Sequence, residues 1–298
     1  MKQRLTAGIL FCMLCFVLAF SAQTAQSVRD ALQLCAFSVI PSLFPFFVLT
    51  GLFVALSPSN LFPRRVSQMA SSLFGCGSEA LTVFFLGILG GYPLGARTVA
   101  QMYHSNRISP ETAQHLILFC NNAGPSFILG MVGLGRFGSL RVGVYLYLIH
   151  VFCAALLGIF FRRKTSSIAT PDSFAAPPSF ATALVNSIVS AGSSMVQICS
   201  FVVFFVTLLQ LFSALTGVNH PLLLGLIELT GGILRLGDTP TDFAMAAALL
   251  GWGGTSVHLQ TAAVLQDTPV HFTRYLCAKL AHGIVSFCAA YALSPFIF

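Results

Sequence analysis

The feature that most constrains this chain is its succession of long apolar stretches, each ended by a short basic cluster. The stretch Gly138–Phe161 is one of them, and Arg162, Arg163 and Lys164 follow it directly. An apolar helix of about 20 residues spans the hydrocarbon core of a bilayer, and basic residues gather at the ends of such spans. The pattern predicts an all-α fold, a polytopic membrane helical bundle with roughly eight or nine apolar segments.

The scarcity of charge supports this fold class. Charged residues make up 8% of the 298 residues, and apolar residues make up 56%. A soluble domain carries about 25% charged residues, so this chain cannot build a surface that faces water on all sides. We therefore expect a lipid bilayer to cover much of the outside, which places the protein in the cell membrane as a multi-pass protein.

Neither the basic residues nor the cysteines point to a nucleic acid or a metal. The formal net charge is +7, but the basic residues lie where spans should end, which is typical of topology anchors. The nine cysteines are scattered, and Cys12 and Cys15 lie in the middle of an apolar run with no second pair. We expect no nucleic-acid partner, no metal site and no cofactor.

Enzyme chemistry also lacks a basis in the sequence. Ser256 and His258 are two residues apart, so they cannot face each other on one helix. The chain has no Gly-x-Ser-x-Gly elbow, no phosphate-binding loop and no zinc-binding helix motif. The sequence predicts that the protein is not an enzyme.

The order of segments divides the chain into two similar halves. Residues 1–27 form an amino-terminal span or signal anchor, for which a cleaved signal peptide ending near Ala19-Phe20-Ser21 is the alternative. A polar, proline-containing linker follows the first half. The predicted parts after the first span are a first repeat at 28–164, a linker at 165–180 and a second repeat at 181–298.

Each half carries interrupted helices. In the first half, Pro41 and Pro45 predict either a kinked span or two half-helices that form a re-entrant hairpin. Glycines recur every fourth residue over Gly87–Gly95, which predicts close helix packing, and Tyr92-Pro93 within this run predicts an unwound turn. Asn121–Ser126 adds two asparagines and a Gly-Pro pair.

The second half repeats this order of interruptions. Ser187–Gln197 corresponds to Pro41–Pro45, Gly225–Ile233 to Gly87–Gly95, and Gly251–Ser256 to Asn121–Ser126. Helices broken at corresponding places in two halves indicate a transporter-type site near the middle of the membrane. The basic clusters favour halves that are inverted relative to each other, although Arg64 and Arg65 then fall on the outer side.

Polar residues at membrane depth are candidates for binding a solute. Asparagine, glutamine, serine and threonine offer neutral donors and acceptors, and helix amino ends after Pro93, Pro125 and Gly254 could hold an anion. The predicted helix breaks are Pro41, Pro45, Tyr92, Pro93, Pro125, Gly253 and Gly254. The predicted substrate-binding residues are Asn121, Asn122, Gly124, Ser126, Glu228, Thr230, Ser256, His258 and Gln260.

Several of these residues keep two interpretations. Glu228 either takes up a proton or cation during transport or serves as a structural hydrogen-bonding group. His258 either contacts solute and protons or forms a satisfied contact between helices. Arg235 and Asp238, at the end of the same segment as Glu228, are expected to pair with each other at the interface.

Three blocks of sequence resemble those of the nucleoside-recognition (Gate) domain membrane proteins. They are Gly90-Gly-Tyr-Pro-Leu-Gly-Ala-Arg97, Phe119-Cys-Asn-Asn-Ala-Gly-Pro-Ser-Phe-Ile128 and Gly253-Gly-Thr-Ser-Val-His-Leu-Gln260. Within that family, the chain resembles the sporulation integral membrane protein (YlbJ-type) subgroup, over roughly residue 28 to the carboxyl end. The resemblance implies kinship with concentrative nucleoside transporters and a role in spore formation, in which dipicolinic acid moves across the membrane surrounding the forespore.

The leading functional hypothesis is a transporter or permease for a small polar or anionic solute, with dipicolinic acid as the cargo that the resemblance implies. The alternatives are a nucleoside-type transporter, a sensor or channel gate, and a non-transporting partner in a membrane assembly whose polar residues join helices. The expected partners are the lipid bilayer, a small-molecule solute, other sporulation membrane proteins and further copies of the chain.

Overall fold

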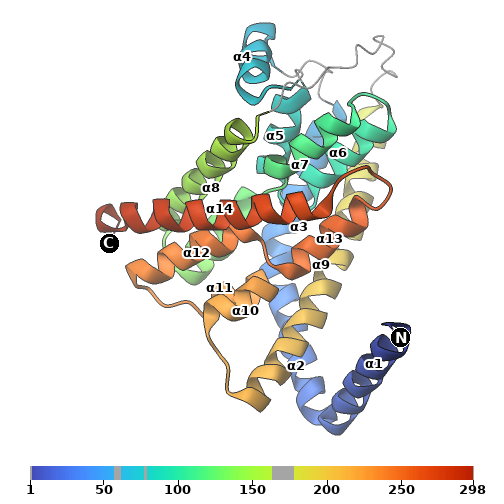
Figure 1. The fold of residues 1–298 in the computed structure, drawn as a ribbon, viewed down its shortest axis with the longest axis vertical. Coiled ribbons are helices and arrows are strands. Elements are labelled where there is room, and N and C mark those ends of the chain that lie inside the picture. Colours follow the sequence, from blue (N-terminus) through green and yellow to red (C-terminus); the bar gives the residue numbers. More distant parts are fainter. Residues whose placement is uncertain (1, 57–61, 77–78, 163–177, 298) are drawn as a thin grey trace.

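The computed structural model describes residues 2–56, 62–76, 79–162 and 178–297, and every regular element in these ranges is a helix. The all-helical architecture confirms the predicted fold class, and the chain is a multi-pass membrane protein (Figure 1). Most of the predicted linker at 165–180 lies outside the described residues. The helices long and apolar enough to cross a membrane are Ser21–Phe53, Leu140–Phe160, Phe180–Thr216 and Phe272–Phe296.

The amino-terminal part is built from two long helical stretches joined at Phe20. Its elements are α1 (Lys2–Ala19), α2 (Ser21–Leu34), the π-helical turn η1 (Cys35–Val39) and α3 (Ile40–Leu56). The polar run after Phe20 is helical and begins α2. The predicted amino-terminal span or signal anchor at residues 1–27 stays a prediction. In Figure 1, α1 (dark blue) stands apart from the rest of the molecule.

The predicted break at Pro41 and Pro45 is wrong. The helical path continues through both prolines, which excludes the re-entrant hairpin and leaves a continuous span. A proline removes one amide donor and clashes with a carbonyl one turn earlier, and a π-helical turn widens the helix where such a clash arises. η1 lies directly before Pro41, and the hydroxyl of Ser42 donates to the carbonyl oxygen of Ser38.

The middle of the chain forms a set of short helices followed by a long one. These elements are α4 (Arg64–Phe74), α5 (Glu79–Gly90), α6 (Leu94–His104), α7 (Pro110–Cys120), the π-helical η2 (Ser126–Arg136) and α8 (Leu140–Phe160). Ser109 accepts a hydrogen bond from the backbone amide of Thr112 at 3.2 Å, and Pro110 follows it as the first helical residue. This cap fixes where α7 begins.

The carboxyl-terminal part begins with one long helix. Its elements are α9 (Phe180–Thr216), α10 (Pro221–Ile227), α11 (Leu229–Leu234), α12 (Pro240–Trp252), α13 (Thr255–Val264), α14 (Phe272–Leu293) and the 3₁₀ turn η3 (Ser294–Phe296). The interruption predicted over Ser187–Gln197 is absent, because α9 is continuous. The hydroxyl of Ser194 donates to the carbonyl oxygen of Ser190 at 2.9 Å, so serines here bond within the helix.

The same order of interrupted helices occurs twice. α5 and α6 are separated by a break, as are α10 and α11, and α7 and η2 are separated as are α12 and α13. Even the helix starts correspond, since α12 has a capping box at Thr239 with Pro240 next, as α7 has Ser109 and Pro110. The closing helices differ, because α8 packs on η2 whereas α14 packs along α12. The division of the chain into two inverted repeats stays a prediction.

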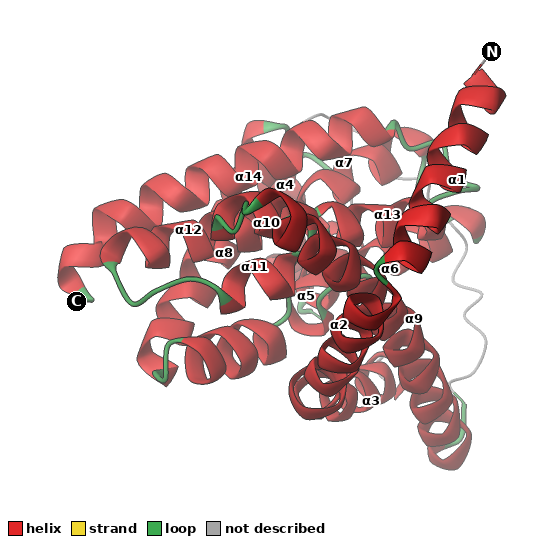
Figure 2. Ribbon diagram, turned by 90° about the horizontal axis from the view of Figure 1, so that it is seen from below, coloured by secondary structure: helices red, strands yellow, loops and turns green. Residues whose placement is uncertain are grey.

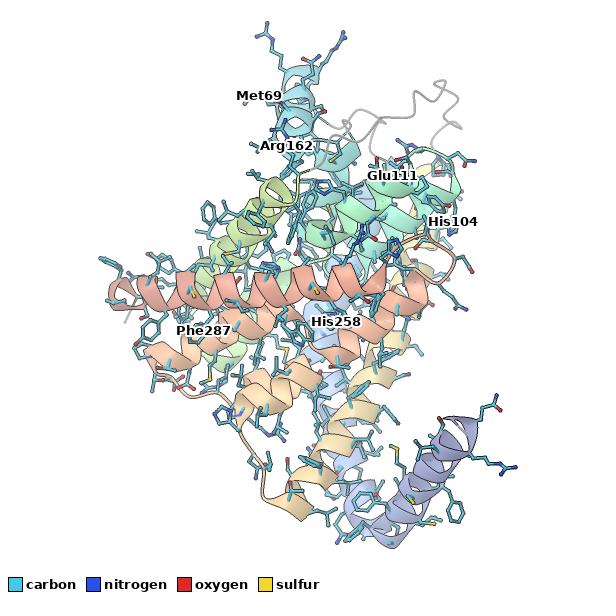
Figure 3. All side chains as sticks on the ribbon, viewed as in Figure 1. Met69, His104, Glu111, Arg162, His258 and Phe287 are labelled. Atoms are coloured by element: carbon cyan, nitrogen blue, oxygen red, sulfur yellow. The ribbon has the colours of Figure 1, made fainter. Side chains whose placement is uncertain are left out.

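The packing joins both sets of helices in one core and leaves apolar surface outside. Ile128 and Leu146 lie in the same buried cluster as Phe243 and Leu249. Long helices carry exposed apolar side chains, and Phe160 is 81% exposed, as lipid contact requires. α9 packs along both α2 and α3, which follow each other through η1 (Figure 2). The axis of α14 runs roughly across the direction of α9 (Figure 1). Figure 3 shows His258 in the interior, with Met69 and Glu111 at the periphery.

Candidate functional site

The four helix breaks meet in the interior of the molecule. A Cβ atom added to Gly91 would lie 2.8 Å from the backbone nitrogen of Gly124, so the first two breaks touch backbone to backbone. In the second set, a Cβ atom on Gly254 would lie 3.0 Å from the backbone nitrogen of Leu229. Gly91 has φ +71° and Gly253 has φ +96°, a region that favours glycine. The glycines therefore permit both the turns and their close approach.

Specific side chains satisfy the backbone groups that the first-half breaks release. The hydroxyl of Tyr147 donates to the carbonyl oxygen of Ile88 at 3.1 Å, near the end of α5. Lys279 Nζ donates to the carbonyl oxygen of Asn121 at 3.0 Å, and the amide of Ala123 donates to His150 Nε2 at 3.1 Å. Freed backbone groups inside a membrane protein need such partners, so these contacts stabilise the breaks.

The breaks of the second half are held in the same manner. The indole nitrogen of Trp252 donates to the carbonyl oxygen of Leu226 at 2.8 Å, and the hydroxyl of Thr255 donates to the same oxygen at 3.1 Å. The hydroxyl of Tyr92 donates to the carbonyl oxygen of Leu250 at 3.2 Å. Because Tyr92 belongs to the first half and Lys279 to the second, each half supplies a donor to a broken helix of the other.

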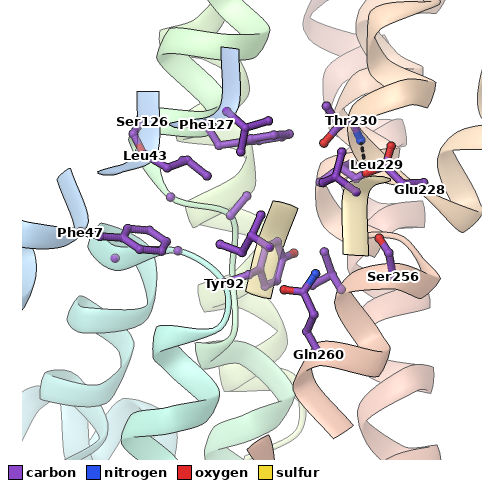
Figure 4. Close-up of a pocket in the computed structure, with 18 residues that line it drawn as sticks. Leu43, Phe47, Tyr92, Ser126, Phe127, Glu228, Leu229, Thr230, Ser256 and Gln260 are labelled. Carbon is purple, nitrogen blue, oxygen red and sulfur yellow. Dashed lines mark hydrogen bonds between the residues drawn. The ribbon is translucent and has the colours of Figure 1, made fainter. Parts of the chain in front are cut away.

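A cavity of about 60 Å³ lies where the breaks meet. This volume leaves room for several water molecules, since about 10–15 Å³ holds one. Figure 4 shows Tyr92 beside Gln260, with Phe47 and Leu43 across from the second-half residues Glu228 and Ser256. The first-half segments, α3, α9 and the second-half breaks all contribute to the wall, so the cavity is enclosed by both sets of interrupted helices.

The cavity brings together six of the nine predicted substrate-binding residues. These six are Gly124, Ser126, Glu228, Thr230, Ser256 and Gln260, and the predicted break residue Tyr92 joins them. Ser126 Oγ is buried and finds no hydrogen-bond partner among the described residues. A buried hydroxyl without a partner is costly, so Ser126 is suited to a solute or water molecule in the cavity.

The other three predicted residues lie outside the cavity wall. Asn121 is fully buried, and its Nδ2 donates to Thr261 Oγ1 at 2.9 Å and to the Tyr275 hydroxyl at 3.2 Å. Asn122 Nδ2 donates to the carbonyl oxygen of Phe119 at 2.7 Å. His258 Nδ1 lies 3.1 Å from the Tyr275 hydroxyl. His258 Nε2 is buried and finds no hydrogen-bond partner among the described residues, so both interpretations of His258 stay predictions. The two asparagines bond at the break between α7 and η2.

Glu228 has both a structural contact and a place in the wall. Its carboxylate accepts hydrogen bonds from the amides of Thr230 at 3.0 Å and Gly231 at 2.6 Å, so it caps the amino end of α11. In the structure, the anionic group at this helix end is therefore the side chain of Glu228. Glu228 also lines the cavity, so the interpretation as a proton or cation site stays a prediction.

The structure corrects the pairing expected for Arg235 and Asp238. Arg235 Nη1 donates to the carbonyl oxygen of Gly231 at 2.7 Å, whereas Asp238 Oδ1 accepts from Arg136 Nη1 at 2.9 Å. Arg136 also donates to the carbonyl oxygen of Leu236, so it joins the end of η2 to the end of α11. The sequence could not show this pair because its members lie in different halves.

A buried basic cluster beside the break between α7 and η2 was missed in the sequence. Lys279 is 1% exposed, and its Nζ lies 3.2 Å from His282 Nδ1. His282 Nε2 lies 3.0 Å from the carbonyl oxygen of His150, and the two imidazole rings stack with centroids 4.6 Å apart. The available signal was a lysine and a histidine within the last apolar segment, since ionisable residues inside a membrane span are rare without a purpose.

Metal ligation has no site in the part of the chain that the structure describes. No group of three or more histidine, cysteine, aspartate or glutamate side chains is placed to hold an ion there. The chemistry of the cavity is therefore that of hydroxyl, amide and carboxyl groups on an otherwise apolar wall. Such a wall can bind and orient a small polar molecule.

The chain is similar to the sporulation integral membrane protein YlbJ of Bacillus subtilis (strain 168). The two are 25% identical over a 291-residue alignment that covers 83% of this chain and 71% of that protein. No family model matches the chain. No solved structure matches it either.

Proposed function

We propose that this protein is a transporter or permease that moves a small polar or anionic solute through the cavity between its broken helices. One observation carries the proposal: two sets of interrupted helices line a cavity, at the point where their ends meet, whose mostly apolar wall carries a few polar side chains. Interrupted helices that converge on a polar cavity are the usual form of a binding site in secondary transporters. The proposal includes no catalytic role.

The similarity to a sporulation membrane protein directs the proposal toward spore formation. In this finer form, the chain is a Gate-domain protein of the membrane surrounding the forespore, and dipicolinic acid is the cargo. Deletion of the gene in its source organism should then lower spore dipicolinic acid, measured by terbium fluorescence of heat-treated spores. Normal content would remove this cargo and would leave the transporter proposal to be tested by accessibility.

Water access to the cavity is the first requirement of a transport path. We expect Ser256→Cys to react with a charged, membrane-impermeant thiol reagent in intact membranes, because Ser256 lines the cavity. Ala246→Cys is the matched control, since Ala246 is fully buried and lies outside the cavity wall. Peptide mass spectrometry separates the new thiol from the nine native cysteines. A contradiction of a solute path would be no labelling at either site while Ser105→Cys, in the exposed loop between α6 and α7, is labelled.

A non-transporting assembly partner is the second candidate. The observation that favours it is the burial of Asn121, Asn122 and His258, of which Asn121 and His258 bond to other segments of the chain. Under this alternative, substitutions at cavity residues and at these three positions would lower protein level alike. Under the transport proposal, Ser256→Ala would change solute uptake at a normal protein level.

A further inference from the structure

A second cavity adjoins the first and has a different chemical character. It also measures about 60 Å³ and shares Phe47 and Gly90 with the first cavity. Its polar wall consists of Thr50, Ser187, Ser190, Ser194 and Arg97. The serines lie on α9 three or four residues apart, so they occupy one face of that helix. This is the polar run that the sequence suggested would break the helix, and it serves as a cavity wall.

Arg97 is the residue that gives this cavity its charge. Its Nη1 donates to Ser194 Oγ at 2.9 Å and its Nη2 donates to Gln197 Oε1 at 3.1 Å, so both acceptors are neutral. Within the described residues Arg97 takes part in no ion pair, and both of its hydrogen-bond partners there are uncharged. A half-buried guanidinium without an anionic partner is costly, which indicates that an anion completes the site.

The amino end of α6 adds to the positive potential of the same cavity. Leu94, the first residue of α6, and Pro93 before it line the cavity beside Arg97. The amino end of a helix carries partial positive charge and unpaired amides, so it favours an anion. A carboxylate suits the remaining wall, because a guanidinium fork binds its two oxygens together and serine hydroxyls can donate to them.

We propose that the second cavity binds a carboxylate group of the solute and that Arg97 is the residue that recognises it. The inference rests on the proposed transport function and narrows its substrate class to carboxylates. A solute that carries a carboxylate would be held by Arg97 while its remaining part occupies the first cavity across Phe47 and Gly90.

The test compares carboxylates with their neutral amides on the purified full-length protein. The probes are pyridine-2,6-dicarboxylate, benzoate and succinate, each beside its carboxamide, with the thermal unfolding midpoint as the measure of binding. We expect at least one carboxylate to raise the midpoint of the parent protein, and its amide to have no effect. In Arg97→Gln we expect the apparent affinity for that carboxylate to fall at least tenfold.

Two controls separate recognition from structure. Arg274→Gln removes an equal charge from an exposed position outside both cavities, so it should keep the parent affinity. Gln197→Ala removes one tether of Arg97 but leaves the guanidinium, so it should also keep carboxylate binding. If Gln197→Ala lost binding as fully as Arg97→Gln, the role of Arg97 would be to hold α9 in place, and the inference would fail.

The inference and the transport proposal fail in different ways. Uptake of a neutral solute into liposomes, with no carboxylate stabilising the protein, would overturn carboxylate recognition and leave transport standing. Carboxylate binding that Arg97→Gln does not weaken would also overturn the inference. Absence of both uptake and stabilisation, for a protein that unfolds cooperatively, would overturn both.

Discussion

Replacing Gly95 by alanine is expected to destabilise the protein by about 3 kcal/mol, because there is no room for a methyl group. A Cβ atom at Gly95 would overlap the carbonyl oxygen of Cys120 and would lie 3.0 Å from the Cα atom of Asn121. These are backbone atoms at the break between α7 and η2, so there is no flexible side chain that could move aside. The apparent Tm in detergent should fall by about 6–12 °C, as roughly 2–4 °C per kcal/mol implies.

The matched control is Gly192→Ala on α9. Nothing lies within 4 Å of a Cβ atom at Gly192, and alanine is the better helix former by about 1 kcal/mol, so Tm should hold or rise slightly. Gly87→Ala would place a methyl group against the same Cys120 oxygen. Since one displacement of that carbonyl relieves both contacts, the double variant should lose less than the sum. A parent-like Tm for Gly95→Ala would contradict the close packing of α5, α6 and α7.

The glycine pattern shows what the sequence could and could not predict. A glycine every fourth residue predicted an exposed backbone face and close packing, and that face is present. The partner was not predictable, because Cys120 lies in a separate segment and bears no mark of a contact. In physical terms, a small residue indicates that something approaches closely, whereas the identity of that element depends on the whole fold.

The wrong breaks have a common cause. Prolines at 41 and 45 and the serine-rich run of α9 were treated as interruptions by composition alone. At the prolines the helix continues after the π-helical turn η1. In α9 the helix continues through the serine-rich run, where the Ser194 hydroxyl donates to a carbonyl oxygen of its own helix. A break needs an external partner for the backbone groups it frees. The breaks that are present have such partners, including Tyr147, Trp252 and Thr255, which sequence order could not connect to them.

The candidate site was predictable from residue type, and its geometry was not. Ser126, Glu228, Ser256 and Gln260 line the cavity as polar residues at membrane depth should. The sequence did not separate them from Asn121, which has the same chemistry and faces Thr261 and Tyr275 instead. Which side of a broken helix a polar residue faces depends on packing that involves the opposite half.

The second large effect is expected at Lys279, whose side chain joins α14 to the break between α7 and η2. Its Nζ donates to the carbonyl oxygen of Asn121 at 3.0 Å and lies 3.2 Å from His282 Nδ1, in a position that is 1% exposed. Asn121 caps the carboxyl end of α7, where the helix dipole favours a positive charge. Lys279→Met keeps a stem of similar length and removes both donated bonds.

Two energies oppose each other in this variant. Removal of the amine relieves the cost of burying it, but it leaves two buried acceptors without a donor, at about 1–3 kcal/mol each. Two such acceptors together cost about 2–6 kcal/mol, so the loss of hydrogen bonds should dominate. We expect a net destabilisation of about 3 kcal/mol, comparable to that of Gly95→Ala, and measured as the shift of the thermal unfolding midpoint.

Leu280→Met is the matched control for Lys279→Met, because the adjacent side chain is 52% exposed and receives the same new residue. It should leave the midpoint unchanged. An unchanged or higher midpoint for Lys279→Met would mean that the buried amine does not stabilise the folded protein. A residue retained at that cost would then need a functional reason, whereas a large loss assigns Lys279 to the support of the broken helix.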